Sequence, residues 1–312
     1  MDDALYRGPI VDTHIHLWDL SMRRHPWLDP NDTQAAPLGD LAPLRRDYLP
    51  PDYRADAAGQ NVVAAVHVEA AWDPATPLEE TRWLESLDKP DGIPTRYVAA
   101  VALEAADAEA VIAAQAGYER VTGVRARLSW HADPAKRFAA RADLMQDSAW
   151  LAGVRALGRH GLHLEAMIYP QQADEFARVA AASPSQTFIV NHCASPVDRD
   201  AAGIGRWRSA LRRLAGVPNM MLKISNVGAY VSAPTRAQVR EVALTCIDEF
   251  GASRCMFASD YPPARLHTPF GEIFEAFRHA VQGFSPAEQA ALFHDNAVRC
   301  YRMDGSAKAA LE

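Results

Sequence analysis

The sequence has 312 residues, of which 49% are hydrophobic and 23% are charged, the composition of an ordinary globular protein. A formal net charge of −7 argues against a surface that coats nucleic acid, since such a surface needs clustered basic residues. No apolar run approaches the ~18 residues that a membrane span needs. We therefore expect a protein that acts on a small molecule, with neither a nucleic acid nor a membrane as partner.

The N-terminal residues and the cysteines both favour a cytoplasmic protein. The opening "MDDALYRGP" is acidic and polar and lacks the basic and apolar regions of a secretory signal. The cysteines are widely spaced and form no CxxC pair, so they predict free thiols rather than a zinc knuckle or a redox motif. The sequence leaves a homo-oligomer open.

The first predicted strand carries two histidines two residues apart. In "IVDTHIHLW", at residues 10–18, β-branched residues start an apolar run that ends in His14 and His16. Residues i and i+2 of a strand point to the same face, so both imidazoles are expected to project together. A pair on one face favours a functional site over two separate core histidines.

A long polar segment follows this strand. Residues 29–53 are rich in proline and other turn-forming residues, which predicts an extended loop over about residues 19–60. Loops of this length in compact domains usually serve as lids or binding loops. We expect this loop, with Trp27 and Tyr48, to cover a site.

Beyond the loop, strands and helices alternate regularly. With the first strand included, the predicted strands are 10–18, 61–72, 95–103, 121–130, 162–170, 187–195, 219–226 and 254–262. The predicted helices are 77–89, 107–118, 147–161, 173–183, 207–216, 236–251, 272–281 and 286–302. This alternation predicts an α/β fold with a parallel sheet, and eight units favour a single (β/α)8 TIM barrel.

We expect one barrel domain over residues 1–303 and a disordered tail over residues 304–312, part of which resembles a cloning scar. No glycine-rich GxGxxG fingerprint follows a strand, so no nucleotide cofactor is expected.

In barrels of this kind the active site lies at the carboxyl ends of the strands. The sixth strand ends in Asn191 and His192, and the eighth ends near Asp260. The remaining candidates at or near strand ends share polar or charged side chains on one strand face: Glu69, Arg125, Arg127, Glu165, Tyr169 and Lys223. Glu69, Glu165 and Lys223 have an alternative structural role as buried ion pairs, and His67 and His163 lie deeper and are expected to be core residues.

Six stretches of the chain together resemble the amidohydrolase superfamily. In order they are "VDTHIHLW…HPWL", "DYLPPDYRADAAGQNVVAAVHVEAAWDP", "VTGVRARL", "VNHCASP", "PNMMLKIS" and "CMFASDYP". The resemblance runs from about residue 9 to residue 303 and is closest to the branch with sugar lactonases, 2-pyrone-4,6-dicarboxylate lactonase and galactarolactone isomerase.

The resemblance implies that His14, His16, His192 and Asp260 line the catalytic centre, and that Asp260 handles the proton of the attacking water. It also implies that Arg125 and Arg127 bind a carboxylate or hydroxyl groups of the substrate. Where metal-dependent members usually bring a lysine from strand four and a histidine from strand five, this chain has Arg127 and Tyr169. We therefore expect no two-metal centre, and at most one zinc ion, on His14, His16 and Asp260 with Glu165 as a weaker candidate.

The predicted reaction is the hydrolysis of a lactone of a sugar acid or a related carboxylated ring. General base catalysis by Asp260 contributes ~10²–10⁴-fold, which suits an activated ester better than an amide. We expect His14 and His16 to stabilise the oxyanion and His192 to orient the reactants. Arg125, Arg127, Tyr169, Lys223, Glu69 and Trp27 are the residues expected to bind substrate. The alternatives are a lactone isomerase, a metal-dependent non-oxidative decarboxylase and a barrel that only binds a sugar acid.

Overall fold

The computed structural model describes residues 5–31, 39–231 and 233–303. Eight parallel strands form one sheet in the order of the chain, and a parallel bridge between Ile15 and Tyr261 brings the first strand beside the segment after the last. The strands are β1 (Ile10–Ile15), β2 (Val62–Val68), β3 (Arg96–Ala100), β4 (Val121–Arg127), β5 (His163–Met167), β6 (Phe188–Val190), β7 (Met220–Ile224) and β8 (Cys255–Phe257). The predicted TIM barrel is confirmed.

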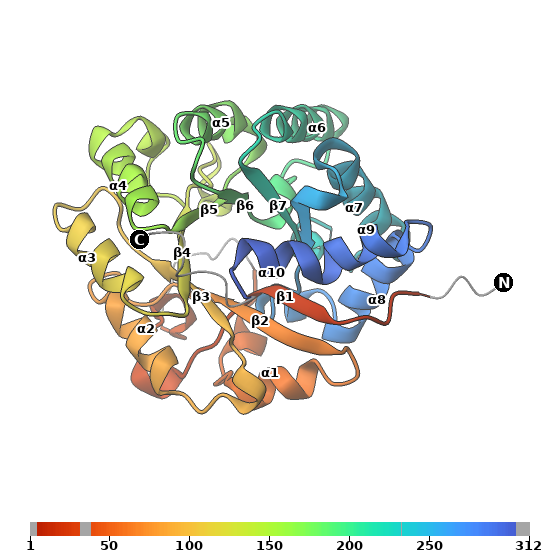
Figure 1. The fold of residues 1–312 in the computed structure, drawn as a ribbon, viewed down its shortest axis with the longest axis horizontal. Coiled ribbons are helices and arrows are strands. Elements are labelled where there is room, and N and C mark those ends of the chain that lie inside the picture. Colours follow the sequence, from red (N-terminus) through yellow and green to blue (C-terminus); the bar gives the residue numbers. More distant parts are fainter. Residues whose placement is uncertain (1–4, 32–38, 232, 304–312) are drawn as a thin grey trace.

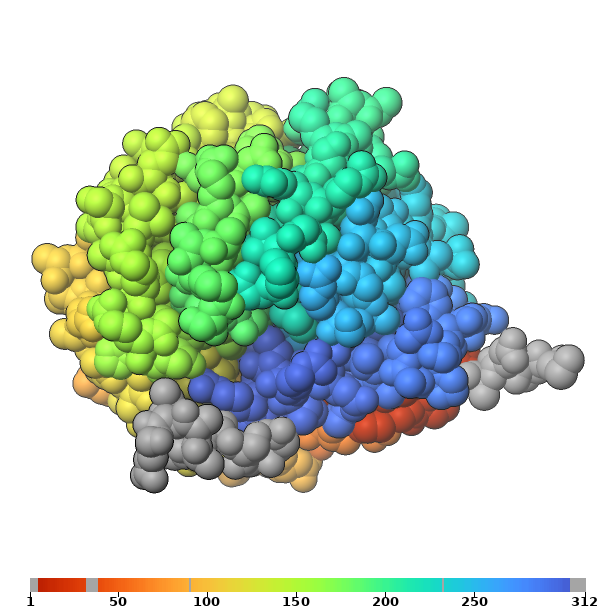
Figure 2. Space-filling view, turned by 45° about the horizontal axis from the view of Figure 1, so that its top comes forward, coloured from red at the N-terminus to blue at the C-terminus, as the bar shows by residue number. Residues whose placement is uncertain are grey.

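Helices surround the strands as a ring (Figure 1). They are α2 (Pro77–Ser86), α3 (Ala108–Ala116), α4 (Ser148–Arg159), α5 (Ala173–Ala181), α6 (Ala201–Ala215), α7 (Arg236–Phe250) and α8 (Phe270–Ala280). Helix α4 shows why they form: Asp147 caps the first turn, and Trp150, Val154 and Leu157 recur at helical spacing on the buried face. In Figure 2 the green-to-blue part of the chain packs into a continuous outer surface.

Two predicted boundaries need correction. Helix α6 begins at Ala201, six residues before the predicted start, because the Asp200 side chain accepts a hydrogen bond from the backbone N of Gly203 at 2.6 Å. Within the predicted loop, Pro50–Asp56 forms helix α1. Proline is tolerated in the first turn of a helix, so the two prolines that indicated a loop instead begin this helix.

The remainder of the segment after β1 contains short 3-10 turns and an antiparallel bridge between Trp18 and Tyr48. Residues 32–38 of the predicted loop and the predicted tail at 304–312 lie outside the described residues.

The C-terminal segment closes the amino end of the barrel. The predicted helix 286–302 is α9 (Pro286–Ala290), a π-helical turn (Ala291–Asp295) and α10 (Asn296–Cys300) in succession. Figure 1 shows this blue segment crossing the strands inside the ring of helices. Arg96, at the start of β3, donates to the carbonyl oxygens of Tyr301 and Arg302 at 3.2 and 2.7 Å. The carboxyl ends of the strands therefore form the opposite, accessible mouth.

The four cysteines are free thiols, as predicted. Among the described helices, none combines the length and the apolar character that crossing a bilayer would require.

Candidate active site

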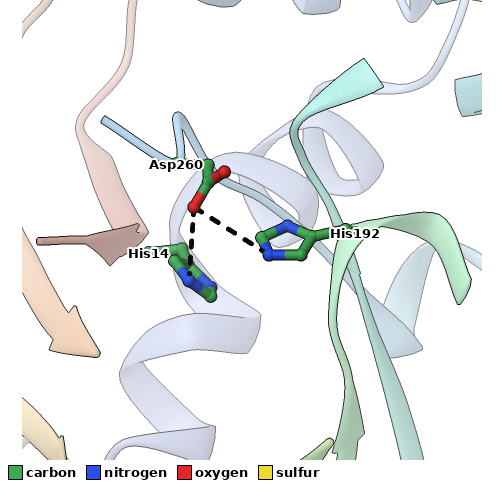
Figure 3. A group of neighbouring side chains, drawn as sticks. All are labelled: His14, His192 and Asp260. Atoms are coloured by element: carbon green, nitrogen blue, oxygen red, sulfur yellow. Dashed lines mark ion pairs between the residues drawn. The ribbon is translucent and has the colours of Figure 1, made fainter. Parts of the chain in front are cut away.

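Three histidines and one aspartate converge at the mouth of the barrel. His14 and His16 lie at the end of β1, His192 follows β6, and Asp260 follows β8. Asp260 Oδ1 lies 3.2 Å from His16 Nε2, 3.4 Å from His14 Nε2 and 3.9 Å from His192 Nε2. Figure 3 shows the Asp260 carboxylate directed at His14 and His192. The structure thus brings together all four residues that the sequence singles out as catalytic candidates.

The backbone at this mouth adopts the left-handed conformation at several non-glycine residues. The φ angles are +52° at His192, +50° at Asn226 and +57° at Asp260, and His192 begins a run of four such residues that ends at Ser195. Each costs roughly 1–2 kcal/mol for a residue with a Cβ, and such strain concentrates at functional sites. Here it turns side chains at strand ends back over the barrel mouth.

A residue that the sequence reading missed holds the Asp260 turn in place. Asp12 lies in β1, where it accepts hydrogen bonds from Ser259 N at 2.9 Å, Ser259 Oγ at 2.6 Å and Tyr53 Oη at 3.0 Å. Burial raises the pKa of the Asp12 carboxyl to about 6, against the lowering effect of these hydrogen bonds. The signal in the sequence is an acidic residue inside the apolar run "IVDTHI".

The hydrogen-bond partners assign the proton position on one imidazole. His16 Nδ1 lies 2.8 Å from the carbonyl oxygen of Val68, so Nδ1 carries the proton and Nε2 directs a lone pair toward Asp260. His14 faces donors at both ring nitrogens, with Lys223 Nζ 3.4 Å from Nδ1 and Arg125 Nη1 3.4 Å from Nε2, and its Nε2 also lies 3.4 Å from Asp260 Oδ1. His14 and His16 therefore flank the carboxylate, and His16 offers a second acceptor beside it.

The electrostatics keep Asp260 ionised and keep His14 and His192 neutral. Burial opposes ionisation of Asp260, but neighbouring groups that include the Arg125 guanidinium outweigh it and lower the pKa of the carboxyl below its usual value. Burial lowers the pKa of His192 to about 4 and, with Lys223 nearby, lowers that of His14 well below its usual range. His192 Nδ1 lies 2.9 Å from Ser225 Oγ, which fixes the orientation of the ring.

Arg125 extends this cluster with a positive charge. Its Nε donates to Glu69 Oε1 and its Nη2 to the Glu69 carbonyl oxygen, both at 2.6 Å, and its Nη1 lies 3.4 Å from His14 Nε2. Burial disfavours the charged form of Glu69, yet Arg125 and Arg127 lower the pKa of this carboxyl to about 2. Glu69 thus orients a guanidinium that faces the reaction centre.

Lys223, expected to bind substrate, and Glu165, the weaker metal-ligand candidate, both lie inside the barrel instead. Lys223 Nζ donates to Glu165 Oε2 at 2.7 Å and to the Thr13 carbonyl oxygen at 2.6 Å, and both charged side chains are fully buried. Asn191 Nδ2 and Tyr301 Oη also donate to Glu165, at 2.8 and 2.7 Å. This pair inside the barrel matches the alternative structural role that the sequence left open, and both Glu165 oxygens are engaged within the protein.

A cavity of about 720 Å³ opens over the cluster. The predicted residues that line it are His16, Trp27, Arg125, Arg127, Tyr169, His192 and Asp260. His14, Glu69, Glu165 and Lys223 are not among its lining residues. Leu41 and Arg45 also line it, so the segment after β1 contributes to the site.

Asn226 and Tyr230 were missed by the sequence reading, because they follow β7 in an irregular turn. The Asn226 side-chain oxygen lacks a hydrogen-bond partner among the described residues.

The donor set partly fits a metal ion. Ligand atoms of His14, His192 and Asp260 all lie within 4.8 Å of one another, and imidazole nitrogen with carboxylate oxygen suits zinc. Lys223 opposes ligation by His14, because a neutral imidazole bound through Nε2 needs its proton on Nδ1, which faces the ammonium group. His16 Nε2 has its lone pair available at 3.2 Å from Asp260 Oδ1. Asp260 and His192 are therefore the ligands best prepared for one ion, with His14 or His16 as the third.

The chain is similar over nearly its whole length to one described family. A family model for the amidohydrolases matches residues 11–303. The uncharacterized protein y4mH of Sinorhizobium fredii is 34% identical over 294 residues, covering 94% of this chain and 98% of the relative. An L-fucono-1,5-lactonase of Burkholderia multivorans is 29% identical over 320 residues, covering 96% and 98% of the two chains.

Solved structures agree on the fold. A zinc-bound amidohydrolase of Burkholderia multivorans superposes with a TM-score of 0.79 at 23% identity, covering 95% of this chain and 99% of that one. A Pseudomonas putida protein assigned as a 2-pyrone-4,6-dicarboxylic acid hydrolase gives 0.70 at 20% identity, covering 96% and 99%.

Proposed function

Because the chain belongs to the amidohydrolase family, we propose that it hydrolyses the cyclic ester of a lactone with water activated by Asp260. The observation that carries the proposal is an ionised, buried carboxylate that lines a cavity together with the neutral imidazole of His192 and the Arg125 guanidinium. The similarity to an L-fucono-1,5-lactonase supports a lactone rather than an amide as the scissile group.

The proposed reaction begins with a water molecule between the cavity and Asp260. Asp260 takes a proton from this water while its oxygen attacks the carbonyl carbon of the lactone. His16 Nε2, with its lone pair beside Asp260 Oδ1, accepts a hydrogen bond from the same water and orients it. His14 does not line the cavity, so we assign it to positioning Asp260, whose Oδ1 lies 3.4 Å from His14 Nε2, rather than to contact with the substrate.

Charge develops on the carbonyl oxygen as the tetrahedral intermediate forms. The Arg125 guanidinium lines the cavity, and a fixed cation there stabilises the oxyanion without reorganisation. His192, held by Ser225, orients the carbonyl group. When the intermediate collapses, the ring C–O bond breaks and Asp260 returns its proton to the departing alkoxide. The product is an open-chain hydroxy acid that loses a proton at neutral pH.

A divalent ion, where bound, would be held by Asp260 and His192 with His14 or His16 as the third ligand, and would polarise the carbonyl as a Lewis acid. The residues present support base catalysis in either state, because Asp260 is already ionised and Arg125 already supplies a positive charge.

The test is proton release from a panel of sugar-acid and pyrone lactones, measured on chelator-treated and on zinc-supplemented protein. Release that survives chelation supports hydrolysis by the protein groups alone, and release only with zinc supports hydrolysis with a bound ion. If no lactone in the panel releases a proton in either condition, the proposal is overturned. Carbon dioxide release from an aromatic acid would instead indicate a decarboxylase.

A further inference from the structure

The charge of the active-site cavity is opposite to that of the whole chain. The chain carries a formal net charge of −7, whereas cationic side chains outnumber acidic ones around the cavity. The cations are Arg45, Arg125, Arg127, Lys136 and Arg137, and the acids are Asp40 and Asp260. A cleft lined by one sign of charge concentrates ligands of the other sign.

Two of these cations are already neutralised by carboxylates. Arg125 pairs with Glu69 at 2.6 Å, and Lys136 Nζ pairs with Asp198 Oδ1 at 3.0 Å. Arg125 also faces the Asp260 cluster, which assigns it to the reaction centre. The charge available for a substrate must therefore come from the other arginines.

Arg137 is held in place without being neutralised. Its Nε and Nη2 donate to the carbonyl oxygens of His131 and Ala132 at 2.5 and 2.7 Å, and its guanidinium lies 5.0 Å from the centre of the Trp130 ring. Among the ion pairs of the described residues, none joins Arg137 to a carboxylate. Neutral carbonyls and a ring orient this cation and leave its charge for a ligand.

Arg127 shares a carboxylate that is already engaged. Its Nε lies 3.6 Å from Glu69 Oε1, the oxygen that accepts from Arg125 at 2.6 Å. One carboxylate thus faces two guanidiniums, and the Arg127 side chain is 42% exposed while lining the cavity. A second anion is needed to balance this side of the site.

Arg127 and Arg137 lie on one side of the cavity. Arg127 ends β4 and Arg137 lies in the following segment, whereas the segments after the opposite strands β7 and β8 contribute the uncharged Asn226, Tyr230 and Pro263 together with the acidic Asp260. Resting on the proposed lactonase function, we infer that the substrate is a lactone that carries a carboxylate, bound by Arg127 and Arg137, with its ring toward β7 and β8. A neutral aldonolactone would bring no anion to Arg137, or to Arg127 beyond the Glu69 carboxylate that it shares with Arg125.

The experiment compares matched substrates in low-salt buffer. Aldaric acid 1,4-lactones, which retain one carboxylate, are paired with aldonic acid 1,4-lactones of the same galacto, gluco or manno configuration, in which a hydroxymethyl group replaces it. We expect a kcat/KM at least about tenfold higher for an anionic member, falling with added salt while that of the neutral member does not. The variants R127Q and R137Q should each lose about 10- to 100-fold on the anionic lactone, mainly through KM.

Two further variants separate charge from structure. R127K keeps the charge and should recover part of the loss. R208Q, which removes a surface pair between Arg208 on α6 and Glu241 on α7, should leave turnover of both substrates unaffected. Equal turnover of the two members of every pair, or equal losses on both in R127Q and R137Q, would overturn the inference and leave the lactonase proposal intact.

If no lactone is hydrolysed, calorimetric titration with the open-chain aldarates and aldonates tests the carboxylate-binding site independently of hydrolysis. Binding of an aldarate that is weakened in R127Q would sustain the anion site while the lactonase proposal fails. Equal affinity for aldarates and for aldonates would overturn the inference as well.

Discussion

Charged side chains are buried both at the mouth of the barrel and in its interior, but their hydrogen-bond partners differ between the two regions. In the interior, Glu165 accepts hydrogen bonds from Lys223, Asn191 and Tyr301, so both of its oxygens are engaged within the protein. At the mouth, Asp260 Oδ1 instead faces a lone pair of His16 at 3.2 Å.

This difference separates structure from function more reliably than residue type does. A buried ion pair with satisfied partners costs little further free energy and needs no ligand. Two acceptors that meet over a cavity, on a backbone with φ near +57° at Asp260, are stable only because the surrounding fold imposes them. Such a group is completed by a proton, a water or a bound ion, which is what a catalytic centre requires.

The largest effect is expected at the mouth. Asp260→Asn removes the base and should lower kcat by ~10²–10⁴-fold while leaving the melting temperature close to that of the unmodified protein. The measurement is steady-state turnover of the best lactone together with thermal unfolding. Asp174→Asn, at a surface pair with Arg213, is the matched control. Turnover by Asp260→Asn equal to that of the unmodified protein would remove Asp260 as the base.

Substitutions of the ion pair in the interior should change the free energy of unfolding. Lys223→Met leaves Glu165 buried without its cation and should lower the free energy of unfolding by about 3–5 kcal/mol. The double variant Lys223→Met/Glu165→Leu removes the unpaired charge and should be more stable than the single one. Denaturant titration measures both, with Lys89→Met as a control outside the barrel. A single variant as stable as the unmodified protein would show that the pair has no structural role.

A smaller effect on turnover is expected from Ser225, the uncharged residue that positions His192 at the mouth. Ser225→Ala removes the hydroxyl 2.9 Å from His192 Nδ1 and should lower kcat by about 2- to 10-fold through a less well oriented ring. Ser209→Ala, on the exposed face of α6, is the control. A change in KM alone would place His192 in binding rather than in the chemical step.

The smallest expected effect is the change of kcat/KM with pH. The pKa of Asp260 is lowered in the folded protein, so its base form is present at neutral pH and is lost only as the pH falls through that lowered value. His192, with its pKa lowered to about 4, also stays neutral. Neither group should therefore contribute an acid limb to the profile of kcat/KM above about pH 5, and a limb near pH 6 is expected only from Asp12, whose pKa is raised to about 6. An acid limb with a midpoint near pH 6 to 7 that persists in Asp12→Asn, on protein shown to be folded, would point to an imidazole as the base.

The sequence predicted the barrel because each strand and helix carries its own periodicity, and it placed His14, His16, His192 and Asp260 because strand ends meet at one mouth. It did not separate Glu165 and Lys223 from the site, since depth along a strand depends on the register between neighbours. Helix α1 was missed because proline marks both loops and first helical turns. Asn226 and Tyr230 were missed because an irregular turn has no period to read.

The central claim is that water activated by Asp260 opens a lactone at its carbonyl carbon. The most direct test is turnover of the best lactone in ¹⁸O-labelled water, with the product analysed by mass spectrometry under single-turnover conditions. Hydrolysis as proposed places one ¹⁸O atom in the new carboxylate and none in the new hydroxyl group. Product without ¹⁸O would indicate isomerisation, and label in the hydroxyl group would indicate attack at the alkyl carbon; either result would contradict the proposed reaction.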